Sequence, residues 1–329
     1  MSDMKYILLT GHRKSGTTLL HKLFDAHPQL NIYPVDISLL YAFLPCQEPH
    51  LTDKQVKDRV NLVIKKSTLK IEGKRVSDFC RNFSADEFAS CVWEHSDASG
   101  FREPHVVIST IATAWSQYTG ADREKPFLFK ETSQSIHAHQ LLRDELPIKV
   151  VQIMRDPRDN YSAIKAGVAK YYSQMGEDEK ESLASLINRS RMDLLAAYEL
   201  REQKNDWFCS LRFEDLVSQT EENVKMLSSF CDVDFAPILL EPTLLGDSFS
   251  GNSHEGKQFK GVSSTNVGRW RERISHFEAA VIEFWMQDVM DKWGYKREIT
   301  AVDAMNAFSE FYNWYNCRYF YHDSFATKK

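Results

Sequence analysis

Short, mostly apolar runs recur along the chain, separated by longer stretches in which apolar residues return every three or four positions. The apolar runs are residues 6–9, 30–33, 127–130 and 148–154. The stretches with a helical pattern are residues 17–26, 51–88, 106–115 and 161–200, with breaks at Gly73 and near Gly176. Strands that alternate with helices predict an α/β fold, in which a central parallel sheet is flanked by helices and carries helical insertions.

No repeat, linker or low-complexity segment divides the chain, so we expect one domain over residues 1–329. Residues 302–329 are predicted to form an aromatic helical extension at its C-terminal end. Aromatic side chains recur there at steps of three and four, from Phe308 to Phe325, and form one apolar helical face. This face predicts packing on the domain, a homodimer contact, or a wall of an acceptor cavity.

Residues 11–20, GHRKSGTTLL, lie between the first predicted strand and the first predicted helix. Gly11 and Gly16 allow the backbone to approach an anion closely. Amides at the start of a helix have no partner within it, and the helix dipole places partial positive charge there. The loop hydroxyls are those of Ser15, Thr17 and Thr18. The stretch predicts a phosphate site in a P-loop-like nucleotide-binding fold; the alternative is a glycine turn that only starts a helix.

The position of the basic residue indicates which anion the loop binds. Loops for nucleoside triphosphates read G-x-x-x-x-G-K-[ST], with a lysine directly after the second glycine. Here Thr17 stands at that position, and the cations lie upstream at Lys14 and Arg13. This argues against a kinase or ATPase that holds a γ-phosphate with magnesium. A P-loop kinase or NTPase and a non-catalytic nucleotide-binding protein are kept as the alternative functions.

A second anion site is predicted where the run 148–154 ends. Residues 155–159 read RDPRD, and Pro157 is well placed to begin the next helix. Arg155 at such a strand end can donate two hydrogen bonds to one phosphate. The alternative is a cluster of surface salt bridges.

Both motifs resemble those of the sulfotransferase family, whose members take a sulfonate from 3′-phosphoadenosine 5′-phosphosulfate (PAPS). Residues 14–18, KSGTT, resemble the family's 5′-phosphosulfate loop, and residues 155–159 resemble its R-[DN]-P-[RK]-D element. Weaker matches follow at Lys130, at 213–216 (FEDL) and in the loop 260–270. The turn DAHP at 25–28 is more similar to carbohydrate, tyrosylprotein and bacterial members than to the cytosolic phenol and steroid group.

The resemblance implies PAPS as co-substrate, adenosine 3′,5′-bisphosphate as product, and no metal. In the family, an arginine and a serine eight residues later bind the 3′-phosphate. The eighth residue after Arg155 is Ala163, and Ser162 lies one helical step of about 100° away. Phe213 stands where the family has a tyrosine near the adenine. The cofactor-binding residues implied are Arg13, Lys14, Ser15, Gly16, Thr17, Thr18, Arg155, Ser162, Phe213, Lys260, Ser263, Ser264 and Arg269.

Sulfonate transfer is an in-line displacement at sulfur, so the protein must position the reactants and stabilise charge on oxygen. Lys14 is suited to the leaving bridge oxygen and the sulfonate, and Lys130 approaches from another strand. The acceptor alcohol must lose its proton to a base.

In the phenol and steroid group this base is a histidine, at the position of Thr132 here. Carbohydrate and tyrosylprotein members use a glutamate just after the second strand, where this chain has Asp36. We therefore expect Asp36 to be the base, with Glu131 second and His137 third. Asp36 also suits the N-cap of a helix over residues 37–44, and both roles can hold.

The net charge of −5 indicates neither a nucleic-acid partner nor a polybasic membrane contact. Six cysteines are scattered singly, which favours reduced thiols and no zinc site. No stretch reaches the roughly 20 apolar residues of a membrane span, so we expect a cytoplasmic enzyme. Its acceptor is predicted to be a small molecule or a saccharide; a sugar hydroxyl, a phenol, an aliphatic alcohol and an amine remain open.

Overall fold

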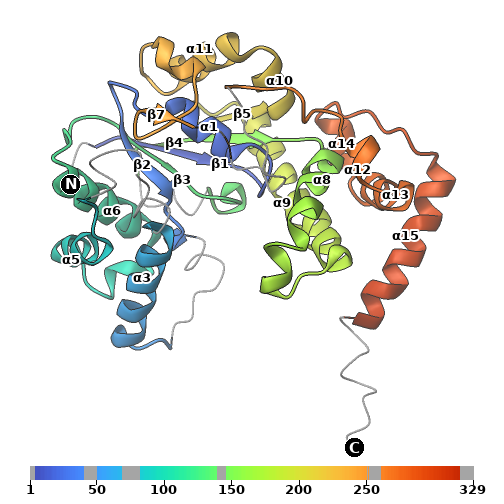
Figure 1. Ribbon diagram of the computed structural model, residues 1–329, viewed down its shortest axis with the longest axis horizontal. Coiled ribbons are helices and arrows are strands. Elements are labelled where there is room, and N and C mark those ends of the chain that lie inside the picture. The colour runs from blue at the N-terminus through green and yellow to red at the C-terminus, as the bar shows by residue number, and fades with distance from the viewer. Residues whose placement is uncertain are drawn as a thin grey trace, which may run out of the picture.

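A sheet of five parallel strands forms the centre of the molecule, in the order β2-β3-β1-β4-β5 (Figure 1). The computed structural model describes residues 4–40, 50–68, 82–138, 146–249, 251 and 261–318. The strands are β1 Tyr6–Thr10, β2 Asn31–Asp36, β3 Phe127–Lys130, β4 Ile148–Met154 and β5 Phe208–Arg212. The predicted α/β fold with a central parallel sheet is confirmed.

The strand β2 is longer than the sequence predicts. It continues beyond Tyr33 to Asp36, which pairs with Lys130 of β3 after a shift in register. Pro34 lies inside the strand and cannot donate a backbone hydrogen bond. It is tolerated because β2 is at the edge of the sheet. The bulged edge strand places Asp36 beside the end of β3.

Alternate side chains of β1 enter two separate hydrophobic cores. Ile7 and Leu9 face one core, and Tyr6 and Leu8 face the other. The helices on the Ile7 face are α1 Thr17–Phe24, α10 Phe213–Ser218 and α11 Thr220–Phe230, above the sheet in Figure 1. The helices on the opposite face include α3 Asp53–Thr68, α5 Ala85–His95, α6 Pro104–Thr119, α8 Pro157–Val168 and α9 Glu179–Glu202. The sheet is therefore covered on both faces, as parallel sheets require.

The predicted helical stretches are divided more finely than their patterns indicate. The stretch 51–88 contains α3 and the start of α5, and Gly73 lies outside the described residues. The stretch 161–200 becomes α8, the short turn η3 Tyr172–Met175 and α9. Gly176 ends that turn with a φ of 80°, a conformation that glycine adopts without strain.

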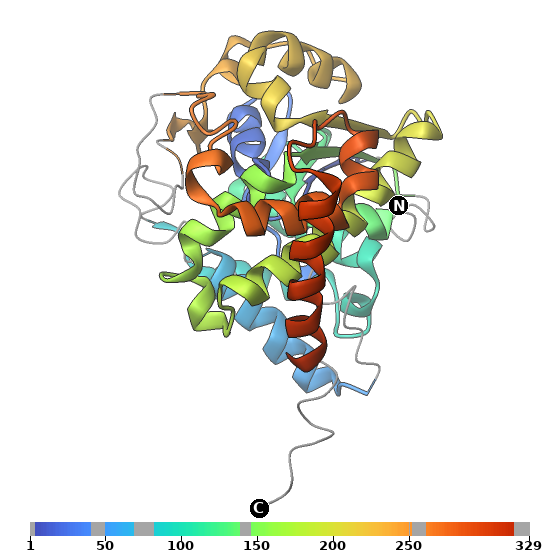
Figure 2. The ribbon, with the colours of Figure 1, turned by 90° about the vertical axis from the view of Figure 1, so that its right-hand side faces the viewer.

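Within the described residues 261–318, four helices lie along one side of the molecule (Figure 2). They are α12 Trp270–Arg273, α13 His276–Trp285, α14 Gln287–Lys292 and α15 Ala301–Asn316. Phe308 of α15 stacks on Phe284 and Trp285 of α13, with ring centroids 4.7 and 5.0 Å apart. This part of the aromatic face packs on α13. Residues 319–329 lie outside the described part, and a homodimer through this helix stays a prediction.

The described helices include none that combines the length and the apolar character needed to span a bilayer. The carboxyl ends of β1, β3 and β4 meet at one edge of the sheet, because the strands are parallel. In open α/β sheets, ligands bind outside this edge.

Candidate active site

The loop between β1 and α1 requires glycine at both ends. Gly11 has a φ of 149°, and a β-carbon there would collide with the carbonyl oxygen of Ile153. Gly16 has a φ of 106°, and a β-carbon would lie 2.5 Å from Cδ2 of Phe213. No side chain caps the start of α1 at Gly16. The first amides of α1 are therefore left to a ligand, as the predicted phosphate loop requires.

The hydroxyl and basic residues of the loop divide into two groups. Lys14, Thr17 and Thr18 line a cavity in front of the loop. Ser15 is buried and donates from its Oγ to the carbonyl oxygen of His12 at 2.6 Å, so its side chain shapes the loop. Arg13 donates to Glu177 at 2.7 Å and stacks over the ring of Tyr172. Its guanidinium thus ties the loop to the start of the α9 region.

The cavity brings together segments that are far apart in the sequence. Its walls come from the phosphate loop, Arg155 and the second half of α8, the junction of β5 with α10, and the segments on either side of residues 252–260. The lining residues are Lys14, Gly16, Thr17, Thr18, Leu19, Arg155, Ala163, Ala166, Phe213, Pro242, Phe249, Gly251, Gly261, Ser263, Asn266 and Arg273. The two predicted anion-binding elements therefore share one cavity.

Arg155 is positioned at the back of this cavity by contacts on several sides. Its guanidinium donates to the carbonyl oxygens of Lys14 at 3.2 Å and Asn266 at 2.7 Å. It also lies over the ring of Phe213, 4.7 Å from the centroid. Burial lowers the pKa of Arg155, although guanidinium groups stay charged in proteins. Arg155 thus places a largely buried cation in the wall of the cavity, with Asp159, Glu214 and Asp156 near it.

The helix after Arg155 presents alanine, not serine, to the cavity. Pro157 begins α8, as predicted, and Asp156 caps it by accepting from the amide of Arg158. Ala163 and Ala166 line the cavity, whereas Ser162 is buried and is not among the lining residues. Phe213 does line the cavity, so its ring is where the resemblance places it.

The segment 261–270 closes one side of the cavity. Asp159 of α8 accepts from the amides of Gly268 and Trp270, at 2.5 and 2.8 Å, and holds this segment beside Arg155. Ser263 lines the cavity, Ser264 is exposed, and Arg269 donates to Asn266 at 3.4 Å. Lys260 lies outside the described residues.

The lining residues outside the predicted set include two that bear polar side chains, Asn266 and Arg273. Asn266 accepts from Arg155 through its backbone, which no sequence pattern reveals. Arg273 belongs to a helix of four residues, too short for a periodic signal. The basic residues clustered after Trp270 were the available hint.

Asp36 and Lys130 form an ion pair at the edge of the site. Lys130 Nζ lies 2.5 Å from Asp36 Oδ1 and 3.5 Å from Oγ1 of Thr18, which lines the cavity. The Asp36 side chain is 23% exposed and that of Lys130 is 5% exposed, so the carboxylate is the more accessible member of the pair. Asp36 ends β2, and the helical residues described after it begin at Leu39. Asp36 is three residues before Leu39, so it does not occupy the N-cap position that was predicted for it.

Glu131 lies next to this pair but is buried, with 2% of its surface exposed. Burial, and then the negative charge of Asp36, raise the pKa of Glu131 to about 8. Its Oε1 accepts from the amide of Thr132 at 3.2 Å. The carboxyl group is therefore mostly protonated at neutral pH. His137, the third candidate base, is half-buried in η2 Ser135–His137 and is not among the lining residues of the cavity.

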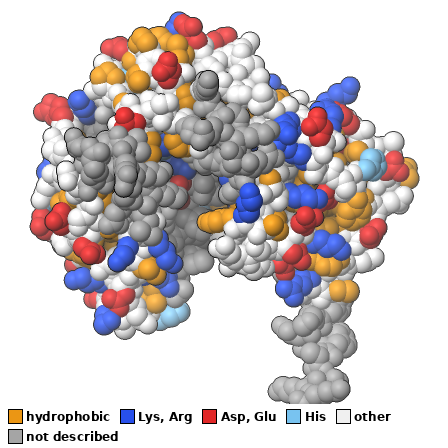
Figure 3. All heavy atoms as spheres, in the orientation of Figure 1, with side chains coloured by type: hydrophobic (Ala, Val, Ile, Leu, Met, Phe, Trp, Pro, Cys, Tyr) orange, Lys and Arg blue, Asp and Glu red, His pale blue; other side chains and the backbone are white. Residues whose placement is uncertain are grey.

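One basic residue that the sequence pattern places near the anion serves the scaffold. Arg158 is buried and donates to Asp156 at 2.7 Å and to Glu283 of α13 at 2.5 Å. It also stacks over Trp270. Acidic and basic side chains are interspersed on the face shown in Figure 3. The basic residues that line the cavity are Lys14, Arg155 and Arg273.

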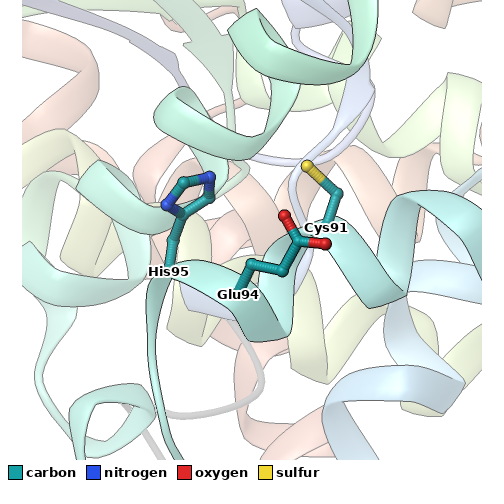
Figure 4. A group of neighbouring side chains, drawn as sticks. All are labelled: Cys91, Glu94 and His95. Carbon is teal, nitrogen blue, oxygen red and sulfur yellow. The ribbon is translucent and has the colours of Figure 1, made fainter.

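Away from this cavity, one group of described side chains could supply metal ligands. Cys91, Glu94 and His95 lie on one turn of α5, with ligand atoms within 4.8 Å of one another (Figure 4). Gln117 of α6 already bonds Glu94 at 2.9 Å and His95 at 2.6 Å. The thiol of Cys91 is protonated more firmly than usual, because burial raises its pKa. The absence of a metal from this protein stays a prediction.

Comparisons with known proteins agree with this architecture. The sulfotransferase domain of the curacin biosynthetic pathway superposes with a TM-score of 0.53 at 16% identity, over 91% of this chain and all of that one. The sulfotransferase domain of the Synechococcus PCC 7002 olefin synthase gives 0.51 at 16% identity, over 94% and 97%. These likenesses show a shared fold.

Comparison by sequence carries the family assignment. No curated protein matches the chain. The sequence model of the Sulfotransferase family matches residues 7–237, which contain the phosphate loop, Asp36, Lys130 and Arg155. Because this match covers more than half of the chain, and the fold agrees, the protein belongs to the sulfotransferase family.

Proposed function

We propose that this enzyme transfers the sulfonate of PAPS to a hydroxyl or amine of a small molecule or saccharide. The observation that carries the proposal is the single cavity shared by the phosphate loop and Arg155. A ligand with phosphate groups at two ends fits two separated sites of positive potential. Family membership supports PAPS as that ligand and adenosine 3′,5′-bisphosphate as the product.

The loop amides and Lys14 are proposed to hold the 5′-phosphosulfate, and Arg155 the 3′-phosphate. Phe213 offers a ring against which the adenine can pack. Ala163 replaces the serine of the family pattern, so Arg155 carries more of the 3′-phosphate contact. Ser263 and Arg273 line the same cavity and are proposed to support it, together with Lys260, Ser264 and Arg269 in the adjoining segment.

The chemistry is a displacement at sulfur. The acceptor oxygen or nitrogen forms a bond to sulfur while the bond from sulfur to the bridging oxygen breaks. The electron pair leaves with adenosine 3′,5′-bisphosphate, and the acceptor proton passes to the base. Lys14 and Lys130 offset the negative charge that develops on the bridging and sulfonate oxygens.

Asp36 is proposed as the base in preference to Glu131. Its carboxylate is partly exposed and touches Lys130, which in turn contacts the cavity residue Thr18. Glu131 is buried, and its raised pKa keeps it protonated at pH 7, so it has little capacity to accept a proton there. Its proposed contribution is to the position and charge of Asp36.

Binding of the product nucleotide tests the cofactor. Adenosine 3′,5′-bisphosphate without metal is expected to stabilise the enzyme by about 2.7 kcal/mol at a concentration of 100 Kd. Arg155→Ala should lose most of this effect. Stabilisation by ATP with magnesium, and none by adenosine 3′,5′-bisphosphate, would instead favour the kinase or NTPase alternative.

A matched pair of variants tests the base. With labelled PAPS and an accepted substrate, Asp36→Asn should lower kcat by about 10²- to 10⁴-fold. Glu131→Gln should keep turnover within about threefold at pH 7. A much larger loss of turnover in Glu131→Gln than in Asp36→Asn would assign the proton transfer to Glu131. If both variants bind the nucleotide as the wild type does, and the wild type itself shows no turnover, a non-catalytic nucleotide-binding protein is favoured.

The described cysteines Cys91, Cys209, Cys231 and Cys317 form no disulfide. Free thiols are typical of a reducing compartment, and we propose a cytoplasmic setting on this basis.

A further inference from the structure

Arg155 also borders a second, much smaller cavity inside the protein. This cavity has a volume of about 10 Å³ and lies between the phosphate loop, the end of β4, and helices α8 and α9. The residues that matter for its chemistry are His12, Gln152, Arg155, Asn160 and Asp193. All five are at most 8% exposed. The cavity is therefore a polar site within the core, directly behind the proposed phosphate contact.

These five side chains carry polar atoms that make no hydrogen bond to any described residue. The atoms are His12 Nδ1 and Nε2, Gln152 Oε1, Arg155 Nε, Asn160 Oδ1, and both carboxylate oxygens of Asp193. His12 Nδ1 lies 3.5 Å from Asp193 Oδ2, which is too long for a good hydrogen bond. Each buried polar atom without a partner costs roughly 1–3 kcal/mol. So many at one place indicate a bound ligand.

The other ends of the same side chains hold the phosphate loop. Asn160 donates from Nδ2 to the carbonyl oxygen of Arg13 at 2.7 Å. Arg155 donates to the carbonyl oxygen of Lys14 at 3.2 Å. A ligand that fixes Asn160 and Arg155 from behind would therefore also fix the loop that faces the nucleotide.

The chemistry of the lining identifies the ligand. Four of the atoms are oxygens that accept: one each from Gln152 and Asn160, and two from Asp193. Arg155 Nε–H donates, and His12, kept neutral because burial lowers its pKa, donates one N–H and accepts at the other nitrogen. A metal cation cannot accept from Arg155 or His12, and the guanidinium would repel it. Water both donates and accepts, and the volume is close to the minimum for one molecule.

We propose that this cavity binds one internal water molecule, through which Asp193 of α9 positions the Arg155 guanidinium and the phosphate loop. The water donates to acceptor oxygens of the lining and accepts from Arg155 Nε–H. Asp193 is thus a positioning residue that does not touch the nucleotide. The effect on nucleotide affinity rests on the proposed function; the water site does not.

A crystal structure of the full chain at about 1.5 Å resolution tests the site itself. The expected result is one ordered water within hydrogen-bond distance of Arg155 Nε, Asp193 and at least one further lining atom. Direct contact of Asp193 with Arg155 Nε, with no room for water, would overturn the proposal. This result is independent of whether the protein binds any nucleotide.

Asp193→Asn tests the positioning role, because it keeps the shape and removes the charge. The Kd for adenosine 3′,5′-bisphosphate is expected to rise about tenfold. In turnover, the KM for PAPS should rise by a similar factor with kcat within about twofold, since Arg155 holds the 3′-phosphate equally in ground and transition states. In an Arg155→Ala background, Asp193→Asn should raise Kd by much less than tenfold, because only the contact through Asn160 to the loop remains.

An additional tenfold loss in that background would contradict the positioning role. Met192→Gln is the matched control, since Met192 is the exposed neighbour on α9 and should leave Kd unchanged. If Asp193→Asn does not fold, Gln152→Met removes one acceptor with little change in shape and should raise Kd about threefold. If the wild type binds no adenosine 3′,5′-bisphosphate, the proposed function fails, and the crystal structure still decides the water site.

Discussion

Replacement of Glu131 by glutamine should remove a large part of the pH dependence of folding between pH 5 and pH 8. The carboxyl group of Glu131 is 2% exposed, and its pKa is raised from 4.5 to about 8 by burial and by the charge of Asp36. The folded protein therefore keeps a proton on Glu131 over a pH range in which the unfolded chain has lost it. Glutamine has nearly the same shape and no proton to lose.

The size of the effect follows from proton linkage. Where only the folded state is protonated, the free energy of unfolding falls by about 1.4 kcal/mol for each unit that the pH rises. Glu131 thus stabilises the fold fully at acid pH, and this contribution is lost as the pH rises toward 8. Titration is incomplete near pH 5 and near pH 8, so the change between these values corresponds to about 2.5 full pH units, or about 3–4 kcal/mol.

Urea unfolding of both proteins at pH 5, 6, 7 and 8 measures this difference. Buried histidines such as His12 and His21, whose pKa values are lowered by burial, act in the opposite direction but equally in both proteins. From pH 5 to pH 8, the unfolding free energy of the variant should rise by about 3–4 kcal/mol relative to that of the wild type. Glu124→Gln, at an exposed position, should show no such trend. A difference independent of pH for Glu131→Gln would refute a protonated carboxyl group in the folded state.

Three further substitutions test other parts of the site and its support. Lys14→Ala should lower kcat by about 10²- to 10³-fold, through lost charge stabilisation; near-normal turnover with labelled PAPS would exclude this role. Gly16→Ala should destabilise the fold by about 1–3 kcal/mol and weaken nucleotide binding, because its β-carbon meets the Phe213 ring; urea unfolding and calorimetry measure both. Glu283→Gln should cost about 2–4 kcal/mol of stability at pH 7, since this carboxylate pairs with buried Arg158 and accepts two backbone amides; an unchanged urea midpoint would contradict that.

The central sheet and the phosphate loop were predictable from the sequence because their signals are local. The buried strands are short apolar runs, and Gly11 and Gly16 stand where the backbone needs a positive φ and close approach. Arg155 was predictable because it directly follows the longest of the mostly apolar runs, residues 148–154. The end of β2 was not, since Pro34 is normally a sign that a strand has ended.

The partners of the charged residues could not be predicted. Arg13 pairs with Glu177, and Arg158 pairs with Glu283, although both arginines stand in motifs that suggest an anionic ligand. Such pairs depend on how distant helices pack, which no local spacing records. The rotation of α8 about its axis also depends on packing. From the sequence, either Ser162 or Ala163 could face the cavity, and in the packed helix it is Ala163 that does so.

Phe213 touches both halves of the proposed nucleotide site. Its ring leaves no room for a side chain at Gly16 and lies under the guanidinium of Arg155. An inhibitor with one substituent that displaces this ring would weaken the binding of the nucleotide at both the phosphate loop and Arg155. Related enzymes with a smaller residue at this position would be less sensitive to such an inhibitor. The Phe213 ring is therefore a basis for selective inhibition.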